Sequence, residues 1–442
     1  MIAASSVARP KVILTIIMSI LWLLTVSAVF VETDVYRYAS GILALIALCH
    51  YLTMPQRPAT NWVGWLCMGW GLYVVARFLH FYFSTRPHET GASEWLYVFP
   101  FFFPILGIAF SMMEGQFERI VTAFFVVALV MLVATTKFSL IFAGETVRPL
   151  IMNNQIHGAV ACGLIMLSAY FWLLHQLSDG AVKPAMRWFA GVLAPLVIIL
   201  CLIAVYGAKS KGVWLALGIS LPIAGLMSLT HLRLRTGILL IIAAAILLFG
   251  GMYIVRHNLN KTAGPTITST ISMLDNLADS RDFNGSVLGT INSPSTPNSM
   301  DQRLQLWYDA GELISSAPFF GWGSQWVDRL DATHYPNVLY TLFHNGYLEI
   351  LVRYGISGAI VMSAILIALF TSVLRAYRAG IIPRAVFDLY TVGVLFFAVT
   401  MLSNSNNRLA IGESLALFSS AFACWCNMRV TKHEASKSGL PT

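Results

Sequence analysis

The chain has 442 residues, of which 57% are hydrophobic and only 11% are charged, and its mean hydropathy is +0.72. Soluble domains carry about 25% charged residues, so the composition indicates an integral membrane protein. The net charge of +8 does not indicate a nucleic-acid partner, because the basic residues are scattered between apolar runs. Anionic headgroups and phosphate-bearing lipids are better partners for such a chain.

Many apolar runs are long enough to cross a bilayer, which takes about 20 residues. The first run follows Arg9 and Lys11 and resembles a signal peptide, but it is longer than a typical signal segment and more runs follow it. The sequence therefore predicts an all-α integral membrane protein with about twelve transmembrane helices. The predicted spans lie near 12–31, 35–54, 62–83, 95–113, 117–135, 156–174, 187–206, 211–229, 236–255, 346–374, 385–403 and 409–427.

Basic residues in the short loops predict the orientation of these spans. With a cytoplasmic N-terminus, every cytoplasmic gap carries Lys or Arg, as the positive-inside rule expects. Both termini are then cytoplasmic, and one large periplasmic loop separates the ninth and tenth spans of a protein of the bacterial inner membrane. The predicted parts are transmembrane helices in 1–256, a periplasmic loop domain in 257–343, and transmembrane helices with a cytoplasmic tail in 344–442.

Several cations lie on the predicted outer side, against the usual charge bias, and therefore need a separate explanation. Lys209 and Lys211 occupy a very short gap between two spans, at about the depth of lipid headgroups. Cations that face a lipid in this way are suited to holding phosphate. The outer cations are Arg86, Arg148, Lys209, Lys211, Arg303, Arg353 and Arg408.

The periplasmic segment divides into two parts. Residues 258–300 are rich in Ser, Thr, Asn, Gly and Pro, which predicts a flexible loop with at most a short helix. From Asp301 to Ser316 the apolar residues recur at a spacing of three to four, which predicts an amphipathic helix capped by Asp301. Pro318 and Gly321 are expected to end this helix.

His344 stands just before the span 346–374, so we expect it at the outer membrane face. A neutral imidazole, whose ordinary pKa is about 6.5, accepts a proton near neutral pH. Beside anion-binding cations it is suited to act as a general base on a hydroxyl. The alternatives are structural: an interfacial histidine bonded to a carbonyl, a solvated Arg303, and Lys209 and Lys211 as anchors at a helix end.

Other polar residues also have both structural and functional interpretations. Glu349 and Arg353 are four residues apart on a predicted span, which favours a structural ion pair within the bundle. Asn153, Asn154 and His157 open the sixth span on the outer side. They are suited either to bind substrate or, in the case of the asparagines, to cap the helix.

Patterns of metal and nucleotide sites are missing from the sequence. Cys424 and Cys426 lie in an apolar run with nothing nearby to complete a metal site, which favours core packing. There is no Walker A loop, and the polar segment has neither an HExxH nor an Asp-x-Asp pattern. ATP-driven and metal-dependent chemistry both lose support, so the energy for a reaction is expected to arrive in an activated substrate such as a lipid diphosphate.

Three stretches of the chain resemble the O-antigen ligase and polymerase superfamily of bacterial envelopes. AKSKGVWLALGI (208–219) resembles the family's Ser-Arg-Gly element, and RLQLWYDAGELISSAPFFGWGSQW (303–326) resembles its Arg…Trp…Pro-x-x-Gly-x-Gly stretch. FHNGYLEILVRYGISG (343–358) resembles its His-Asn-x-x-Leu element with a later glycine. The layout of many helices and one large external loop late in the chain is also similar to the family.

The resemblance implies a metal-independent glycosyltransferase without a cofactor, which uses an undecaprenyl-diphosphate-linked glycan as donor. His344 falls on the family's catalytic histidine, Arg303 on its loop arginine, and Lys211 on the arginine before glycine. Lysine at position 211 departs from the pattern, since it keeps the charge but loses the planar group that binds phosphate at two points. We expect Lys209 or Arg148 to help hold the diphosphate. Further substrate-binding candidates are Asn345, Asn154 and His157, with helix capping as the alternative for the asparagines.

Within the superfamily the sequence favours an O-antigen ligase, which joins O-antigen to a sugar hydroxyl of lipid A–core. Polymerases often have two sizeable external loops, whereas this chain has one, and no external arginine here has a glycine eleven positions on. A single displacement, with His344 as base, then inverts the anomeric centre. The alternatives are an O-antigen polymerase, a transporter of lipid-linked glycans, and a scaffold without chemistry.

Overall fold

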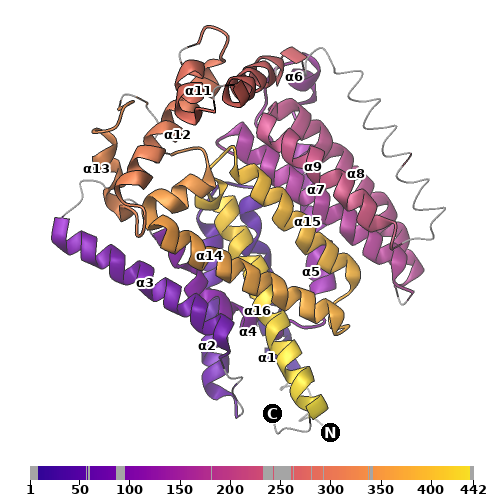
Figure 1. The fold of residues 1–442 in the computed structure, drawn as a ribbon. Helices are drawn as coiled ribbons and strands as arrows, with labels where there is room; N and C mark the ends of the chain where they lie inside the picture. The colour runs from indigo at the N-terminus through magenta and orange to yellow at the C-terminus, as the bar shows by residue number, and fades with distance from the viewer. Residues whose placement is uncertain are drawn as a thin grey trace, which may run out of the picture.

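The computed structural model describes residues 8–438, apart from 56, 58–59, 86–94, 181, 232–241, 243–259, 262, 280, 292, 337 and 339–341. Within these ranges the chain is helical throughout, and the single extended pairing is an isolated bridge between Val31 and Ile151. Figure 1 shows α6 and α11 at one end of the bundle, with the first turn of α1 and the last turn of α16 at the opposite end.

The first half of the chain contains α1 (Ala8–Thr25), η1 (Ser27–Val29), α2 (Val35–Thr53), α3 (Trp62–Thr85), η2 (Trp95–Phe102), α4 (Phe103–Ser111), α5 (Phe117–Thr135), α6 (Phe138–Phe142), α7 (Gln155–Ser178), α8 (Pro184–Ala208) and α9 (Lys211–Ser228). The second half contains α11 (Phe283–Thr290), α12 (Asn298–Ser316), η3 (Gly323–Gln325), α13 (Trp326–Leu330), α14 (Gly346–Arg378), α15 (Arg384–Met401), η4 (Asn406–Arg408) and α16 (Ala410–Ser438).

Nine helices in the described ranges are long and apolar enough to cross a membrane. They are α1, α2, α3, α5, α7, α8, α9, α14 and α15, and each coincides with a predicted span. The chain is thus a multi-pass membrane protein.

Three further predicted spans are not among these nine helices. The run at 95–113 forms a shorter apolar helix, Tyr97–Ser111, whose first part belongs to the 3₁₀ helix η2 with Pro100 inside it. The run at 409–427 lies in α16, whose apolar stretch contains the buried Glu413. The run at 236–255 falls outside the described residues except for Ile242, so the count of about twelve stays a prediction.

The polar segment is more helical than the sequence predicted. Residues 263–279 and the short helix α11 are helical, where a flexible loop with at most a short helix was expected. A contact with a distant residue stabilises the helix at 263–279. The Ser269 hydroxyl donates to the carbonyl of Ser295. The amphipathic helix is present as α12, but Asp301 does not cap it: the helix begins three residues earlier, after Pro297. Asp301 instead lies in the first turn, where a carboxylate interacts favourably with the helix dipole.

The transmembrane helices form two hydrophobic cores. One is built from α1, α2, α3, α4, α14 and α16, and it includes Cys424 and Cys426, so the prediction of core packing for these two residues is confirmed. The other is built from α5, α7, α8, α9 and α15. A third, smaller cluster joins α12 and α13 to Phe343 and Val352. The polar segment therefore packs on the start of α14.

A turn after α12 docks on an interruption of α14 through main-chain hydrogen bonds. Trp322 N donates to Val352 O at 2.8 Å, and Ile356 N donates to Pro318 O at 2.8 Å. Gly321 and Gly355 have positive φ angles of 64° and 62°, and a Cβ atom on either would lie 2.5 Å from backbone atoms of the opposite segment. Only glycine fits both places, which is the physical reason for the glycines in two of the three sequence motifs.

Candidate functional site

The backbone of His344 is held in a left-handed conformation by its neighbours. His344 has a φ of 49°, which is uncommon outside glycine and persists only where surrounding contacts fix it. The preceding residue, Phe343, is fully buried. Its carbonyl accepts from Trp307 Nε1 of α12 at 2.9 Å, and its N–H donates to Glu349 Oε1 at 2.9 Å. His344 is thus fixed between α12 and the first turn of α14.

The imidazole of His344 is oriented by a chain of two asparagines. His344 Nδ1 lies 3.1 Å from Asn404 Oδ1, and Asn404 Nδ2 donates to Asn406 Oδ1 at 2.8 Å. Because the amide nitrogen of Asn404 is directed to Asn406, its carbonyl oxygen faces the ring. Nδ1 must therefore carry the hydrogen, and in the neutral ring the lone pair lies on Nε2.

The surroundings of His344 favour the neutral ring. Burial lowers the pKa of His344 below its ordinary value; the hydrogen bond to Asn404 opposes this shift, and the nearby charge of Arg303 lowers the pKa further. Burial, the hydrogen bond and the charge of Arg303 each change the free energy of the charged imidazolium relative to the neutral ring. The neutral imidazole is therefore favoured, and this is the form that a general base requires.

Arg303 lies within electrostatic range of the two other main candidate residues, His344 and Lys211. It is one helical turn before Trp307 on α12, so both side chains project from the same face, and Trp307 is bonded to Phe343. The charge of Arg303 acts on His344 and also on the ammonium of Lys211. Three residues that are far apart in the sequence are thus brought together.

Lys211 is the first residue of α9, and two segments that are distant in the sequence contact this end of the helix. Its Nζ donates to Thr266 Oγ1 at 2.6 Å. A Cβ atom on the next residue, Gly212, would lie 1.9 Å from Ser403 Oγ, so the start of α9 packs directly on the residue before Asn404. The glycine of the first motif therefore permits the close approach that places Lys211 beside the site.

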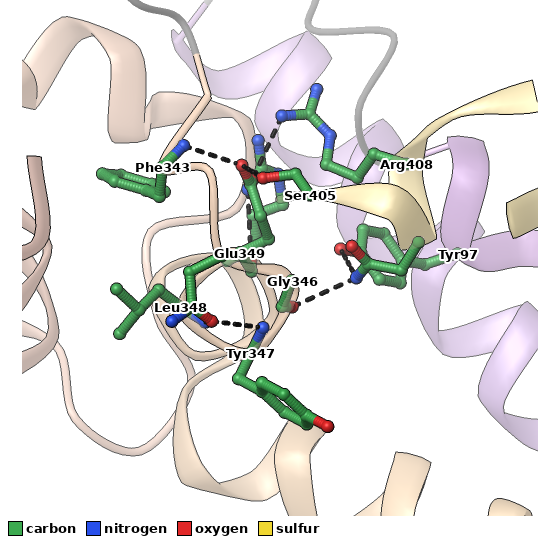
Figure 2. A network of polar contacts seen from close by, with 11 residues as sticks. Tyr97, Phe343, Gly346, Tyr347, Leu348, Glu349, Ser405 and Arg408 are labelled. Atoms are coloured by element: carbon green, nitrogen blue, oxygen red, sulfur yellow. Dashed lines mark hydrogen bonds and ion pairs between the residues drawn. The ribbon is translucent and has the colours of Figure 1, made fainter. Parts of the chain in front are cut away.

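The loop between α15 and α16, residues 402–409, connects the parts of the site. Ser405 Oγ donates to Glu349 Oε1 at 2.7 Å, and Arg408 donates to Glu349 Oε2 at 3.0 Å. Asn407 Nδ2 donates to Gly346 O at 3.1 Å, as Figure 2 shows together with the contacts of Glu349. Apart from Arg408, the sequence analysis did not single out this loop. The polar run SNSNNR between two apolar spans is the signal that marks it.

The predicted ion pair between Glu349 and Arg353 is confirmed, and both side chains are fully buried. The Arg353 guanidinium also lies 4.9 Å from the centroid of the Trp326 ring, a cation–π contact. Arg408 pairs with the same carboxylate at 3.0 Å. Two of the outer cations thus have structural partners and hold the start of α14 in place.

Lys209 and Arg148 are placed differently from the three central residues. Lys209 ends α8 in a left-handed conformation, and its ammonium donates to the Gly144 carbonyl. Arg148 is exposed, next to Val147, whose N–H donates to Gly207 O at 2.9 Å. Lys209 therefore has a structural contact, and no contact in the described part of the chain joins Arg148 to His344.

The three other predicted residues lie at helix starts. Asn345 Oδ1 caps α14 by accepting from the N–H groups of residues 347 and 348, at 3.0 and 3.3 Å, and Asn154 Oδ1 caps α7 at 2.8 Å. His157 Nδ1 lies 2.9 Å from Glu32 Oε1, and its charge acts on His344. Capping thus occupies the side-chain oxygens of both asparagines. His157 lies near the site and is oriented by Glu32. The sequence analysis did not identify Glu32.

An apolar cavity of about 820 Å³ opens between the transmembrane helices next to the site. Tyr347, Met401 and Asn407 line it near the start of α14, and Glu118 and Gln176 line it near the other end of the bundle. Its walls are otherwise almost entirely aliphatic and aromatic side chains from α1, α5, α7, α14, α15 and α16. The cavity is suited to a long hydrocarbon chain.

Within the described residues, no three His, Cys, Asp or Glu side chains are grouped as metal ligands would be. The groups that the site offers for chemistry are the imidazole of His344 and the cationic side chains of Arg303 and Lys211.

A comparison with protein families gives a match to part of the chain. Residues 196–363 match the model of the family described as O-Antigen ligase. The matched range contains Lys211, Arg303 and His344, and it ends before Asn404. A search of curated proteins found no significant match.

Proposed function

We propose that this chain, a member of the O-antigen ligase-type superfamily, is an O-antigen ligase. Members of this family are glycosyltransferase-like enzymes of O-antigen processing, which act on lipid-linked polysaccharide and lipid substrates. The proposed reaction transfers O-antigen polysaccharide from undecaprenyl diphosphate to a sugar hydroxyl of lipid A–core. The observation that carries the proposal is the gathering of His344, Arg303 and Lys211 around one position next to a large apolar cavity.

The donor binds through its diphosphate and its lipid tail. Arg303 and Lys211 hold the diphosphate and compensate the negative charge that grows on it as it leaves. The guanidinium offers a planar, two-point contact, while Lys211 contributes a point charge. The prenyl tail occupies the apolar cavity between the helices. His157, oriented by Glu32, contributes a further contact to the substrate.

The acceptor is activated by His344. A sugar hydroxyl of lipid A–core lies within hydrogen-bond reach of Nε2 and attacks the anomeric carbon of the donor. The hydroxyl proton moves to Nε2 as the new carbon–oxygen bond forms. At the same time the bond to the phosphate oxygen breaks, and its electron pair leaves with undecaprenyl diphosphate. A single displacement of this kind inverts the anomeric centre, and base catalysis contributes about 10²–10⁴-fold to the rate.

The site belongs on the periplasmic side of the inner membrane in this proposal. The positive-inside rule assigns both termini to the cytoplasm, and α6 and α11 lie at the end of the bundle opposite to the first turn of α1 and the last turn of α16 (Figure 1). Residues 257–343 then form the periplasmic loop domain, between transmembrane parts in 1–256 and 344–442.

A reconstituted reaction tests the proposal. Purified protein is incubated in lipid nanodiscs with undecaprenyl-diphosphate-linked O-antigen and lipid A–core, without ATP or added metal. We expect O-antigen joined to lipid A–core, and a loss of at least about 100-fold in His344→Ala, with the variant still folded.

The other outcomes of this reaction identify the alternatives. Longer lipid-linked glycan formed without lipid A–core indicates a polymerase. Movement of lipid-linked glycan across the bilayer without a new covalent bond indicates a transporter. Full activity of His344→Ala removes His344 as the base.

A further inference from the structure

A second pocket lies in the polar segment, outside the site described above. It has a volume of about 310 Å³. One wall is the N-terminal half of α12, and the other is the chain that follows α13. The residues that line it are Asn298, Asp301, Gln302 and Gln305 from α12, and His334, Tyr335, Pro336 and Val338 from the second wall.

The pocket and the catalytic residues lie on opposite faces of α12. Asn298, Asp301 and Gln305 recur at a spacing of three to four, which places them on one helical face. Arg303 and Trp307 project from the other face, because successive helical residues are rotated by about 100°. Since a helix with its side chains is about 10–12 Å across, the pocket lies about one helix diameter from the reacting groups.

Two hydrogen bonds fix the second wall of the pocket to α12, and in each a backbone N–H group of the wall donates to a carboxylate side chain of the helix. Tyr335 N donates to Asp309 Oδ1 at 3.0 Å, and His334 N donates to Glu312 Oε2 at 3.0 Å. The rings of His334 and Tyr335 are 4.6 Å apart, and Tyr308 contacts the Tyr335 ring edge-on at 5.9 Å. The polar and aromatic groups are therefore held in place before any ligand binds.

The lining indicates the chemistry of the ligand. Three amides, a carboxylate, an imidazole and a phenol supply both donors and acceptors, and Gln305 Nε2 already donates to Asp301 Oδ2 at 2.8 Å. No lysine or arginine is among the described residues that line the pocket, so it does not suit a phosphate. Only Pro336 and Val338 are apolar, so it does not suit a lipid tail. A ligand with adjacent hydroxyl groups and an apolar ring face fits both the amides and the aromatic rings.

We propose that this pocket is a glycan subsite, which binds neutral sugar units remote from the bond that is formed. The proposal rests on the proposed function, because it takes the ligand to be part of the polysaccharide that the enzyme handles. Binding energy from remote parts of a substrate is available to orient the reacting groups. The sugar units come either from the O-antigen chain of the donor or from the core of the acceptor, and the two sources share the same chemistry.

The test compares substrates of different glycan length. The double variant Asn298→Ala/Gln305→Ala removes two amides from the pocket and leaves His344, Arg303 and Lys211 in place. Donors carry either a single sugar or several O-antigen repeats, and acceptors carry either a full or a truncated core. Ser315→Ala is the matched control, since Ser315 is exposed on α12 away from the pocket.

We expect kcat/KM of the double variant to fall about tenfold for the longer substrate, as the loss of two hydrogen bonds implies. Activity on the shortest pair of substrates stays within about twofold of wild type. A fall confined to the long donor assigns the pocket to O-antigen, and a fall confined to the full core assigns it to the acceptor. Equal losses on long and short substrates, or no loss on any, would overturn the subsite.

A binding measurement separates this proposal from the proposed function. Free O-antigen oligosaccharide, released from its lipid, is titrated into the wild-type protein, the double variant and Ser315→Ala. We expect about tenfold weaker binding in the double variant alone. If no joined product forms with any substrate while this difference remains, the proposed function fails and the subsite stands. Equal binding in all three proteins would rule out the subsite.

Discussion

His344 Nδ1 lies 3.1 Å from Oδ1 of Asn404, a residue 60 positions further along the chain. This contact decides which ring nitrogen carries the hydrogen and leaves Nε2 as the acceptor. An asparagine in this place orients the ring without adding a negative charge, unlike the carboxylate that pairs with many imidazoles. Burial and the charge of Arg303 disfavour the imidazolium and lower the pKa of His344, while the hydrogen bond to Asn404 opposes this shift. The surroundings of His344 thus favour the neutral imidazole, the form that the proposed general base requires.

The first prediction concerns the pH dependence that follows from this contact. The active form of His344 is neutral, and burial and Arg303 lower its pKa below the ordinary value. As the pH falls, activity should therefore persist until the pH passes below about 6.5, the ordinary imidazole pKa. Asn404→Asp places a carboxylate against Nδ1 and stabilises the imidazolium. Its acid limb in a profile of kcat/KM should move to higher pH.

Asn404→Ala is the control for this prediction. It removes the orienting contact without adding charge, so it should lower the rate across the whole pH range and leave the acid limb at or below that of wild type. An unchanged acid limb in Asn404→Asp would show that His344 does not control the reaction as a base.

The second prediction concerns Lys211, which stands where the family has arginine. Lys211→Ala should lower kcat/KM by about 10–100-fold, the value of a hydrogen bond to a charged group. Lys211→Arg should retain most of the activity, because it keeps the charge and adds the planar two-point contact. Steady-state rates with varied lipid-linked donor measure both. Equal losses in the two variants would point to packing instead of charge, since Lys211 also contacts Thr266.

The third prediction concerns the close approach at Gly212. A methyl group there would meet Ser403 Oγ at 1.9 Å and would move the loop that holds Asn404. Gly212→Ala should therefore lower kcat at least about tenfold, as misplacement of catalytic groups does. Gly218→Ala, on the same helix with nothing within 4 Å of the added atom, is the matched control and should stay near wild type.

A second substitution, at Ser403, tests whether the contact with Ser403 causes the loss of activity in Gly212→Ala. Ser403→Gly removes the hydroxyl that the new methyl group would meet, so it should restore part of the activity of Gly212→Ala. A Gly212→Ala protein with wild-type rates would show that the approach of α9 to this loop does not position the site.

The sequence predicted the transmembrane helices well and the polar segment less well. Apolar runs of spanning length are a local property of the chain, and nine of the predicted spans have their helices in the described ranges. The helix at 263–279 was missed because its stabilising contacts are distant: Thr266 accepts from Lys211, and Ser269 donates to Ser295 O. Its polar composition alone resembles that of a loop.

The candidate site was predictable from the sequence only where its residues stand in a local motif. His344, Arg303 and Lys211 stand in motifs that resemble those of a family, so the chain itself marks them. The roles of Asn404 and Glu32 follow from their partners, His344 and His157. The polar run SNSNNR marks the loop that holds Asn404, but only the fold shows which residue of that loop contacts His344.

The last prediction concerns the buried carboxylate of Glu349. It accepts from Phe343 N and Ser405 Oγ and pairs with Arg353 and Arg408. Glu349→Ala leaves two guanidinium groups without their counter-charge, one of them fully buried. Removal of one partner from a buried pair costs about 3–5 kcal/mol. Thermal unfolding of the purified protein in detergent should show this as a large fall in Tm, together with a loss of activity, because Phe343 holds His344.

The matched control for Glu349 is the ion pair between Arg375 and Glu434. Its two atoms are 2.8 Å apart, but its side chains are 49% and 58% exposed, and an exposed pair contributes less than about 1 kcal/mol. Glu434→Ala should therefore leave both the Tm and the activity nearly unchanged. If Glu349→Ala lowered the Tm no more than Glu434→Ala, Glu349 would not stabilise the start of α14. The position of His344 would then depend on other contacts, among them those with Trp307 and Asn404.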